Sequence, residues 1–257
     1  MNAIMKRIAL AGTVILASLA SASGADTLRF ATEAAYPPFN ERAADGSIVG
    51  WEIDLGSAMC EKMGRKCEFV AQDWDGMIPG LLSKRFDGIF ASMSITEERK
   101  QRIDFTDKYY QSPAHFIAKK GTTIDRSASN LGGLKLGTIG GVQECFLKKH
   151  YPDAQFSLYR SAEDMYLDLE AGRIDAILSE SVQADFGLIR VKPEAGYAFI
   201  GEPVLDNECY GEGIGIGLRK EDTELKQQLN KAIADVRADG TYDKLVQKYF
   251  GYDIYGQ

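Results

Sequence analysis

The stretch Phe90-Ala-Ser-Met-Ser-Ile-Thr-Glu-Glu-Arg99 brings two serine hydroxyl groups, a helix start and a guanidinium together. Ile89 and Phe90, followed by small residues, are typical of a buried strand that reaches the surface at its carboxyl end. Thr96, followed by two glutamates, predicts a helix N-cap with acidic residues in the first turn. Arg99 comes roughly one turn after this cap, so its side chain can fold back over the strand end.

This arrangement indicates a receptor for a carboxylate. A guanidinium offers a planar pair of donors, and the Ser92 and Ser94 hydroxyls and free backbone N–H groups flank it. A structural interpretation is also open, in which both serines fill a tight turn and Arg99 is a solvated helix charge. The stretch alone does not decide between them, and the rest of the chain favours the receptor.

The beginning of the chain predicts an export signal. Lys6 and Arg7 precede an apolar run without acidic residues, and small residues follow. Such a run is too short for a membrane span and is typical of a cleaved signal peptide. We therefore expect residues 1–25 to be removed, with cleavage after Ala22 or Ala25, and the mature protein to be soluble in an oxidising compartment.

The charge of the mature chain limits its partners. Without the leader it has 28 basic and 37 acidic residues. This negative balance disfavours nucleic acid and anionic membranes as partners, and it weakly favours a cationic small ligand. The remaining length of about 230 residues is enough for one large or two medium lobes.

Four cysteines are present. Cys60 and Cys67 lie where a helix ends and the next strand begins, and this spacing in an exported protein predicts a structural disulfide. Cys145 and Cys209 remain, far apart in sequence. They are either a second bridge within one lobe or two isolated buried thiols.

Strands and helices alternate along the chain, which predicts an α/β fold with a mainly parallel sheet. We expect strands at 27–32 and around Phe69-Val70 and helices at 52–63 and 77–82. Further helices are expected at 161–172, at 225–239 and at 242–249. The glycine-rich residues 210–219 predict a strand in tight contact with other backbone, which crosses back between two lobes and forms part of a hinge.

An internal echo supports two lobes. Leu28–Thr32 is repeated as Leu134–Thr138, and Arg85–Ser92 is repeated in the same order as Arg173–Glu180. The matches are short, so two similar lobes and convergent α/β sequence are both compatible with them. Because ligands of open α/β sheets bind at the carboxyl ends of strands, two facing lobes predict a cleft lined by the residues that follow these strands.

Catalytic motifs are missing from the sequence. Its two histidines, His115 and His150, are not part of a metal-ligand cluster, and no nucleophile elbow, P-loop or dinucleotide fingerprint occurs. We therefore expect no metal, no cofactor and no enzymatic activity.

The remaining polar residues suit a zwitterion with a cationic tail. Arg99, Ser94 and the loop that contains Gln143 suit an α-carboxylate, and Glu180 with the Ser92 hydroxyl suits an α-ammonium. Glu33 suits a side-chain cation whose stem lies between two aromatic rings. The candidate ligand-binding residues are Glu33, Tyr36, Trp74, Ala91, Ser92, Ser94, Arg99, Gln143 and Glu180.

Each of these assignments has a structural alternative. Instead of binding a ligand, Tyr36 and Trp74 can be ordinary core aromatics. Glu33 can cap the turn before the prolines, and Glu180 can be an acid at the start of a helix. For Glu52 and Asp54 we expect a role at a helix N-terminus rather than contact with the ligand.

Together these residues resemble the periplasmic solute-binding proteins of polar amino-acid ABC importers, especially the lysine/arginine/ornithine and histidine binders. The motifs that carry the resemblance cover nearly all of the mature chain and are Glu33-Ala-Ala-Tyr-Pro-Pro-Phe39, Gly50-Trp-Glu-Ile-Asp-Leu55, Ser92-Met-Ser-Ile-Thr-x-x-Arg99, Phe105-Thr-Asp-Lys-Tyr109, Ala171-Gly-Arg-Ile-Asp175, Gly215-Ile-Gly-Leu-Arg219 and Asp239-Gly-Thr-Tyr-Asp243.

The resemblance implies a type II periplasmic-binding-protein fold that closes on an amino acid. It implies lobe I at 26–114, lobe II at 115–208, and a return strand with C-terminal helices at 209–257. A periplasmic monomer that delivers its ligand to a membrane permease is also implied, together with a disulfide at Cys60 and Cys67.

The sequence departs from the family pattern in places that bear on the ligand. Relatives usually have Asp at the position of Glu180 and often Thr at the position of Val142, so the preferred tail length and one carboxylate contact are in question. Opine binders are similar around Glu33 and Trp74, which keeps arginine derivatives open as ligands.

Three functions are compatible with the sequence. The first is the binding component of an importer for arginine, ornithine, lysine or histidine. The second is a dehydratase-like enzyme on the same fold, with Glu33 or Glu180 as general acid/base. The third is a sensory subunit, although no attached signalling domain supports it.

Overall fold

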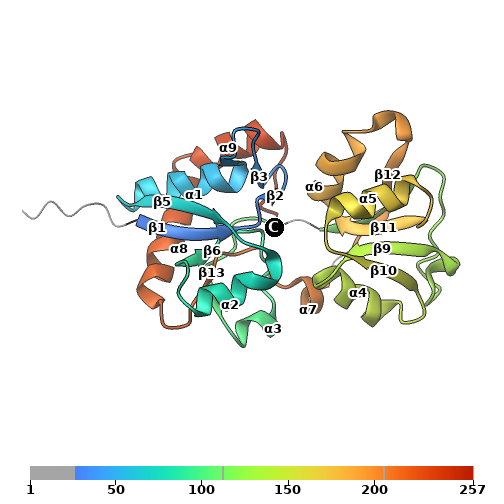
Figure 1. Cartoon of the computed structure of the whole chain (residues 1–257), viewed down its shortest axis with the longest axis horizontal. Coiled ribbons are helices and arrows are strands. Elements are labelled where there is room, and N and C mark those ends of the chain that lie inside the picture. The colour runs from blue at the N-terminus through green and yellow to red at the C-terminus, as the bar shows by residue number, and fades with distance from the viewer. Residues whose placement is uncertain (1–26, 112, 205, 257) are drawn as a thin grey trace, which may run out of the picture.

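The computed structural model describes residues 27–256 except 112 and 205, so the predicted signal peptide lies outside the described residues. Two α/β lobes lie side by side (Figure 1). The sheet of lobe I has the strand order β5-β1-β6-β13-β7, and the sheet of lobe II has the order β10-β9-β11-β8-β12. This confirms the predicted two-lobe α/β fold.

The strands of lobe I are β1 (Thr27–Thr32), β5 (Lys66–Ala71), β6 (Gly88–Ile89), β7 (Asp104–Phe105) and β13 (Gly217–Leu218). A small antiparallel sheet beside them consists of β2 (Ala35–Tyr36), β3 (Asn40–Arg42) and β4 (Ile48–Val49). The strands of lobe II are β8 (Ala114–Lys119), β9 (Lys135–Ile139), β10 (Gln155–Tyr159), β11 (Ala176–Glu180) and β12 (Tyr197–Val204).

The helices of lobe I are α1 (Trp51–Lys62), α2 (Met77–Leu82), α3 (Glu97–Lys100), α8 (Thr223–Ala238) and α9 (Thr241–Tyr249). Lobe II has α4 (Val142–His150), α5 (Ala162–Glu170) and α6 (Ser181–Ala184), and α7 (Asn207–Tyr210) packs against α4. Single turns are η1 (Trp74–Gly76), η2 (Leu131–Gly133), η3 (Asp185–Ile189) and η4 (Pro193–Ala195).

The internal echo corresponds to a repeated topology. In each lobe three neighbouring parallel strands, β5-β1-β6 or β10-β9-β11, form the same half of the sheet. The backbone N–H of Arg29 donates to the Asp87 carboxylate at 2.8 Å, and that of Lys135 donates to the Asp175 carboxylate at 2.8 Å. The repeated Arg-x-Asp motifs therefore fix the same strand junction in both lobes.

The chain passes from lobe I to lobe II between β7 and β8 and returns between β12 and β13. The predicted strand at 210–219 is wrong in extent, because β13 covers only Gly217–Leu218 and α7 takes up the start of the segment. Its tight backbone contact is nevertheless present. A Cβ at Gly211 would lie 1.9 Å from the carbonyl oxygen of Ile95, which only a glycine avoids.

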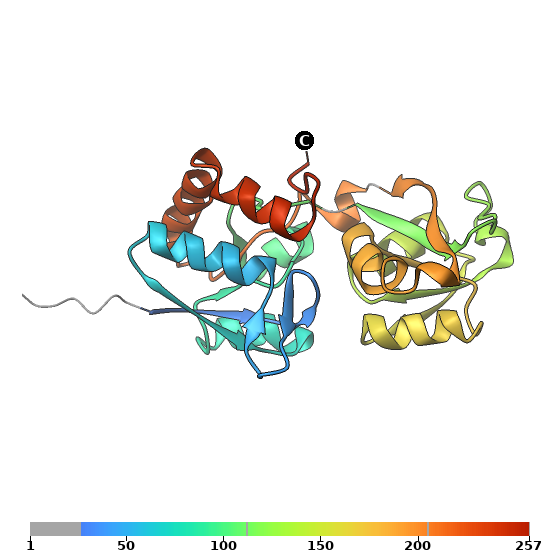
Figure 2. The same cartoon turned by 90° about the horizontal axis from the view of Figure 1, so that it is seen from above.

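The C-terminal residues lie beside the connection between the lobes (Figure 2). The N–H of Gln111, just before β8, donates to the carbonyl of Ile254 at 2.8 Å. The Arg237 guanidinium stacks 3.5 Å from the ring centre of Tyr255, so the end of the chain is held against lobe I by α8.

Both cysteine pairs are bridged. Cys60–Cys67 joins the end of α1 to β5 with a Cα–Cα distance of 5.9 Å, and Cys145–Cys209 joins α4 to α7 at 5.6 Å. The second bridge decides between the two alternatives for Cys145 and Cys209. It ties the returning segment to lobe II before the chain crosses to lobe I.

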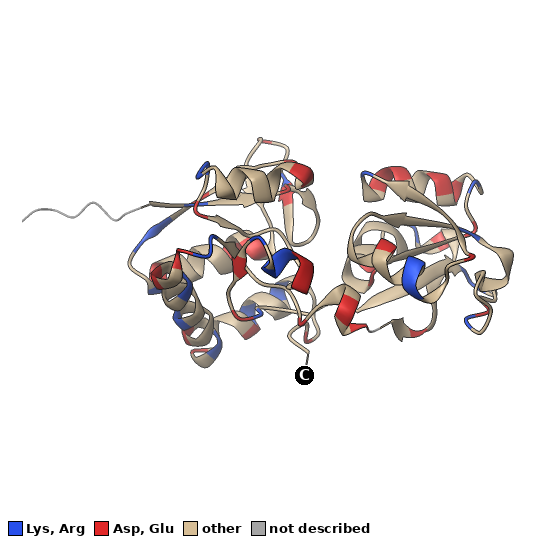
Figure 3. Cartoon of the chain, turned by 90° about the horizontal axis from the view of Figure 1, so that it is seen from below, with Lys and Arg blue, Asp and Glu red and all other residues tan. Residues whose placement is uncertain are grey.

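Acidic residues are spread over both lobes and are prominent on α5 (Figure 3). Within the described part of the chain, no helix combines the length and the apolar character needed to cross a bilayer.

Candidate ligand-binding site

Arg99 is positioned by the short helix α3. Thr96 caps this helix, because its Oγ1 accepts the backbone N–H of Arg99 at 3.3 Å. The guanidinium then folds back, donates from Nη1 to the carbonyl of Ser94 at 2.9 Å, and stacks 5.4 Å from the ring centre of Trp74. Burial lowers the pKa of Arg99, but an arginine remains cationic at neutral pH.

Arg99 also faces lobe II. A Cβ at Gly141, the N-cap of α4, would lie 3.9 Å from Nη2 of Arg99, and Gln143 is buried in the first turn of the same helix. The guanidinium therefore lies beside the backbone of a helix N-terminus, where N–H groups also attract anions. A carboxylate between them would receive donors from both lobes.

Glu180 is the last residue of β11 and occupies the N-cap position of α6, but its side chain makes no capping hydrogen bond. Instead its Oε2 accepts the Tyr36 hydroxyl at 2.7 Å, a bond between lobe II and lobe I. Burial raises the pKa of Glu180 to about 7, against the lowering effect of the Tyr36 hydrogen bond. Glu180 thus begins a helix, as its structural alternative predicts, but its carboxylate bonds to Tyr36 and not to the helix N-terminus.

Ser92 has a partner that its sequence pattern does not predict, the carboxylate of Glu52. Its N–H and hydroxyl donate to Oε1 of Glu52 at 2.8 and 3.1 Å, and Asn40 Nδ2 donates to Oε2 at 2.6 Å. The Tyr109 hydroxyl also donates to this carboxylate. These bonds hold Ser92 at a φ of 54°, an unusual backbone angle for a serine.

The expectation for Glu52 is met in position, because Glu52 lies in the first turn of α1, but its carboxylate bonds to Asn40, Ser92 and Tyr109 and does not cap the helix. Glu52 is fully buried, burial raises its pKa, and no side-chain capping bond is present at Gly50. The sequence did contain a signal, because Glu52 is in register with Leu55, Gly56 and Met59 on the buried face of α1. Asp54 instead accepts from Lys248 and Tyr249 of α9.

Two further candidates lie beside these groups. Ala91 is packed in the lobe I core, next to Ser92 in the chain. Ser94 and Glu180 line one small cavity, together with Tyr210, Gly213 and other residues of the returning segment. The cavity thus has walls from both lobes.

Glu33 follows β1 and lies among acidic groups. Burial raises its pKa, and so do the charges of Asp73 and Glu52. Within 27–256, leaving out 112 and 205, no basic side chain forms an ion pair with Glu33. This corner of lobe I therefore has negative charge that a cation would neutralise.

The two aromatic candidates, Tyr36 and Trp74, pack against different neighbours. Trp74 begins η1 and faces Arg99, whereas the Tyr36 ring stacks on Phe39 at 5.4 Å. Stacking of a ligand tail between Tyr36 and Trp74 stays a prediction.

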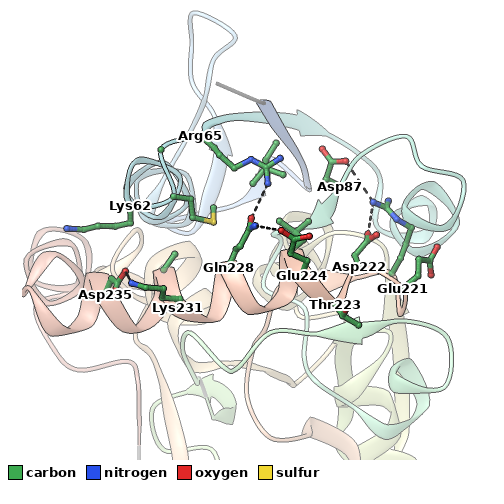
Figure 4. A pocket seen from close by; sticks show the side chains of 16 residues that line it. Lys62, Arg65, Asp87, Glu221, Asp222, Thr223, Glu224, Gln228, Lys231 and Asp235 are labelled. Carbon is green, nitrogen blue, oxygen red and sulfur yellow. Dashed lines mark hydrogen bonds and ion pairs between the residues drawn. The ribbon is translucent and has the colours of Figure 1, made fainter. Parts of the chain in front are cut away.

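A wide groove of about 1180 Å³ lies elsewhere on lobe I, between α1 and α8 (Figure 4). Several of its charged side chains pair within its own wall, as Arg219 does with Asp222 at 2.6 Å and Lys231 with Asp235 at 2.5 Å. We assign no ligand to it. The part of the chain that the structure describes also contains no group of three or more His, Cys, Asp or Glu side chains arranged to hold a metal ion.

Two similar lobes joined by two crossings, with Arg99 and Glu180 on opposite lobes close to a shared boundary, define a two-lobe solute-binding protein. The chain belongs to the bacterial extracellular solute-binding proteins, family 3, whose family model matches residues 28–252.

Individual relatives agree with this assignment. The chain is 39% identical over 257 residues to the L-arginine-binding protein of Pseudomonas aeruginosa, with 98% of this chain and 99% of the relative covered. It is 40% identical over 254 residues to the lysine/arginine/ornithine-binding periplasmic protein of Escherichia coli, with 97% and 98% covered. A solved structure of an ancestral arginine-binding protein bound to arginine is 36% identical, with a TM-score of 0.77 and coverage of 88% and 98%.

Proposed function

We propose that this protein is the substrate-binding component of an ABC importer and captures a cationic amino acid by closure of its two lobes. The observation that carries the proposal is the placement of Arg99 and Glu180, which face the lobe boundary from opposite sides and interact electrostatically. Relatives named for arginine, lysine and ornithine support a cationic ligand.

The amino-acid head is proposed to bind between the lobes. Its carboxylate pairs with Arg99, and the Ser94 hydroxyl and the backbone N–H groups around Gln143 complete its hydrogen bonds. Its ammonium pairs with Glu180 and with the lone pairs of the Ser92 hydroxyl, whose proton is donated to Glu52. Each charge-assisted bond contributes about 1.5–3 kcal/mol, so these contacts support micromolar affinity after ordering costs.

The cationic tail is proposed to neutralise Glu33. Asp73 and Glu52 add negative potential there, and this excess of acid disfavours an acidic ligand. Tyr36 and Trp74 are proposed to contact the stem of the tail. Arginine, ornithine and lysine fit this description, and histidine fits when it is protonated.

The wider context follows from this role. We propose that the protein acts in the periplasm as a monomer, passes its ligand unchanged to a membrane permease, and has no catalytic activity. We also propose that lobe I comprises 26–114 and 209–257 and that lobe II comprises 115–208.

Thermal unfolding of refolded, ligand-stripped protein tests the function. Arginine, lysine, ornithine, histidine, glutamine, nopaline and octopine are added separately. At about 100 times its Kd a ligand adds about 2.7 kcal/mol to the unfolding free energy, which raises the Tm by about 5 °C or more in a protein of this size.

We expect the cationic amino acids to raise the Tm most and mass spectrometry to recover them unchanged after denaturation. A panel in which only opines act would redirect the proposal to an opine carrier. Consumption of the ligand would identify an enzyme and overturn the proposal.

A further inference from the structure

Tyr36 and Glu180 join the two lobes directly. Tyr36 belongs to β2 of lobe I and Glu180 ends β11 of lobe II, 144 positions later in the chain, yet the hydroxyl and Oε2 are 2.7 Å apart. β2 and α6, which follows Glu180, lie on facing sides of the two lobes in Figure 1. The bond uses the same carboxylate that is proposed to receive the ligand ammonium.

The segment after Glu180 is held against lobe I. Val182 belongs to the hydrophobic core of lobe I, and the Phe186 ring packs edge-on against Phe250 with 5.9 Å between the ring centres. These apolar contacts place the end of β11 beside Tyr36. The hydrogen bond therefore has a packed support and does not depend on two freely moving side chains.

Several titratable or charged groups surround Glu180. Arg99 attracts its charge and Glu52 repels it, both from lobe I. The Tyr110 and Tyr210 phenols are near enough to interact with it electrostatically. Both hydroxyls are buried, and neither has a hydrogen-bond partner in the described part of the chain. Of these three phenols, Tyr36 is thus the one that donates to Glu180.

The length of the Glu180 side chain matters for this contact. An aspartate at the same backbone position would retract the carboxylate by about one C–C bond, or about 1.5 Å. The oxygen would then be out of hydrogen-bonding reach of the Tyr36 hydroxyl.

Resting on the proposed function, we propose that Tyr36 is a positioning residue for ammonium recognition: its hydroxyl aims the Glu180 carboxylate across the lobe boundary and favours the ionised form, which pairs with the ligand ammonium. Molecules in which Glu180 is still protonated release this proton to solvent when the ligand ammonium takes its place. Tyr36 keeps its bond to Oε2, since a carboxylate has lone pairs for several donors.

The electrostatics agree with this geometry. Burial raises the pKa of Glu180 to about 7, and the Tyr36 bond lowers it. The unliganded carboxyl is therefore partly protonated at neutral pH, while an ammonium pairs with the ionised form. Removal of the hydroxyl raises this pKa further and shifts the pH range of tight binding upward.

The Tyr36→Phe variant tests the proposal, because it removes the hydroxyl and keeps the ring. Calorimetry measures the Kd of L-arginine from pH 5.5 to 8.5. We expect the affinity of wild-type protein to be highest where Glu180 is ionised. Below the midpoint, the pH at which Glu180 is half ionised in the unliganded protein, the affinity falls by up to about tenfold per pH unit. In Tyr36→Phe the midpoint moves up by about one pH unit, so the loss of affinity is much larger at pH 6.5 than at pH 8.5.

Tyr210→Phe is the matched control for the pH midpoint alone, because Tyr210 lines the same cavity as Glu180 but its hydroxyl donates no hydrogen bond to the carboxylate. Its midpoint stays at the wild-type value, whatever its absolute Kd. In Glu180→Asp the hydroxyl is out of reach, so a further Tyr36→Phe change leaves that midpoint where it is.

Two outcomes overturn the inference and are distinguishable. If Tyr36→Phe weakens arginine binding equally at every pH, the hydroxyl has only a structural role, and the proposed function stands. If wild-type protein binds no amino acid at any pH, the proposed function fails and this inference fails with it.

Discussion

Glu52 and Glu180 are both buried carboxylates, but they have different kinds of partner. Glu52 accepts hydrogen bonds from Asn40, Ser92 and Tyr109, all in lobe I. Glu180 accepts one from Tyr36, across the lobe boundary. A carboxylate satisfied within one lobe stabilises that lobe, whereas one with a single donor from the other lobe has lone pairs left for a ligand.

The raised pKa of Glu180 predicts a pH effect on stability. Its value of about 7 in the folded protein exceeds the ordinary 4.5, so the folded state binds the proton more tightly. The resulting stabilisation is complete below pH 4.5 and is lost as pH rises through 7, by about 3 kcal/mol in total.

Chemical denaturation of the Glu180→Gln variant measures this effect. Relative to wild type, the variant should gain unfolding free energy between pH 4.5 and 8, because glutamine does not ionise. Glu194→Gln, at an exposed position, is the control and should follow the wild-type pH profile. Parallel profiles for wild type and Glu180→Gln would refute the assigned ionisation.

Loss of Arg99 should remove recognition of the amino-acid head. Arg99→Ala takes away the proposed charge-assisted bonds to the carboxylate, and we expect affinity for every α-amino acid to fall by more than about 100-fold. Titration calorimetry measures the change. Arg102→Ala, at an exposed position shortly after α3, should bind like wild type. Retention of binding in Arg99→Ala would place the carboxylate elsewhere.

For single side chains, the sequence predicts contacts between residues that are close together in the chain. The Thr96 cap and the return of Arg99 to the Ser94 carbonyl follow from spacing within six residues. The contact between Glu52 and Ser92 joins positions 40 residues apart, and it depends on how α1 packs against the end of β6. Local pattern carries no such information.

The glycine-rich residues 210–219, which lead the chain from lobe II back to lobe I, have a strict steric requirement at Gly211. Gly211 has a φ of 73°, and a Cβ there would meet the Ile95 carbonyl at 1.9 Å. Gly211→Ala should therefore destabilise the protein by about 3 kcal/mol or more, because backbone must move. Gly133 has a similar φ of 79° with nothing within 4 Å.

Gly133→Ala is thus the matched control and should cost only about 1–2 kcal/mol of backbone strain. Urea denaturation of both variants separates steric exclusion from strain. Equal losses of unfolding free energy would show that the close approach at Gly211 is unimportant.

Helices with a clear hydrophobic period could be predicted from the sequence, whereas the structure of the glycine-rich residues 210–219 could not. The leucine and isoleucine spacing of α8 predicts a helix near its observed bounds, Thr223–Ala238. Residues 210–219 alternate like a strand, but Ile214 bridges both Ser94 and Tyr110. The segment thus follows two neighbours on lobe I, and tertiary contacts outweigh its local pattern.

For the whole molecule, the two disulfides constrain very different lengths of chain. Cys145–Cys209 spans 64 positions and Cys60–Cys67 spans 7. In the loop-entropy account the first contributes about 4 kcal/mol and the second about 2.5 kcal/mol. Serine at both positions of the longer bridge should therefore lower the unfolding free energy more than serine at both positions of the shorter one, as measured by urea denaturation. The reverse order would mean that native-state effects outweigh loop entropy.

The repeated lobe is the feature that the sequence predicted best at this scale. Arg85-Phe-Asp87 and Arg173-Ile-Asp175 mark the same strand junction in each lobe, and the carboxylates of both aspartates accept backbone N–H groups. The contact of Tyr36 with Glu180 could not be predicted from either repeat, since it depends on how the two lobes face each other.

We propose that one zwitterion is bound at its head by Arg99 and Glu180 and at its cationic tail by Glu33. Calorimetric titration with L-arginine and L-citrulline, a neutral analogue of similar shape, tests it most directly when wild type and Glu33→Gln are compared. We predict that wild type binds arginine about tenfold or more tightly than citrulline, and that Glu33→Gln loses this preference while it still binds citrulline. Equal affinity of wild type for the two ligands, or an undiminished preference in Glu33→Gln, would show that Glu33 does not bind the cationic tail.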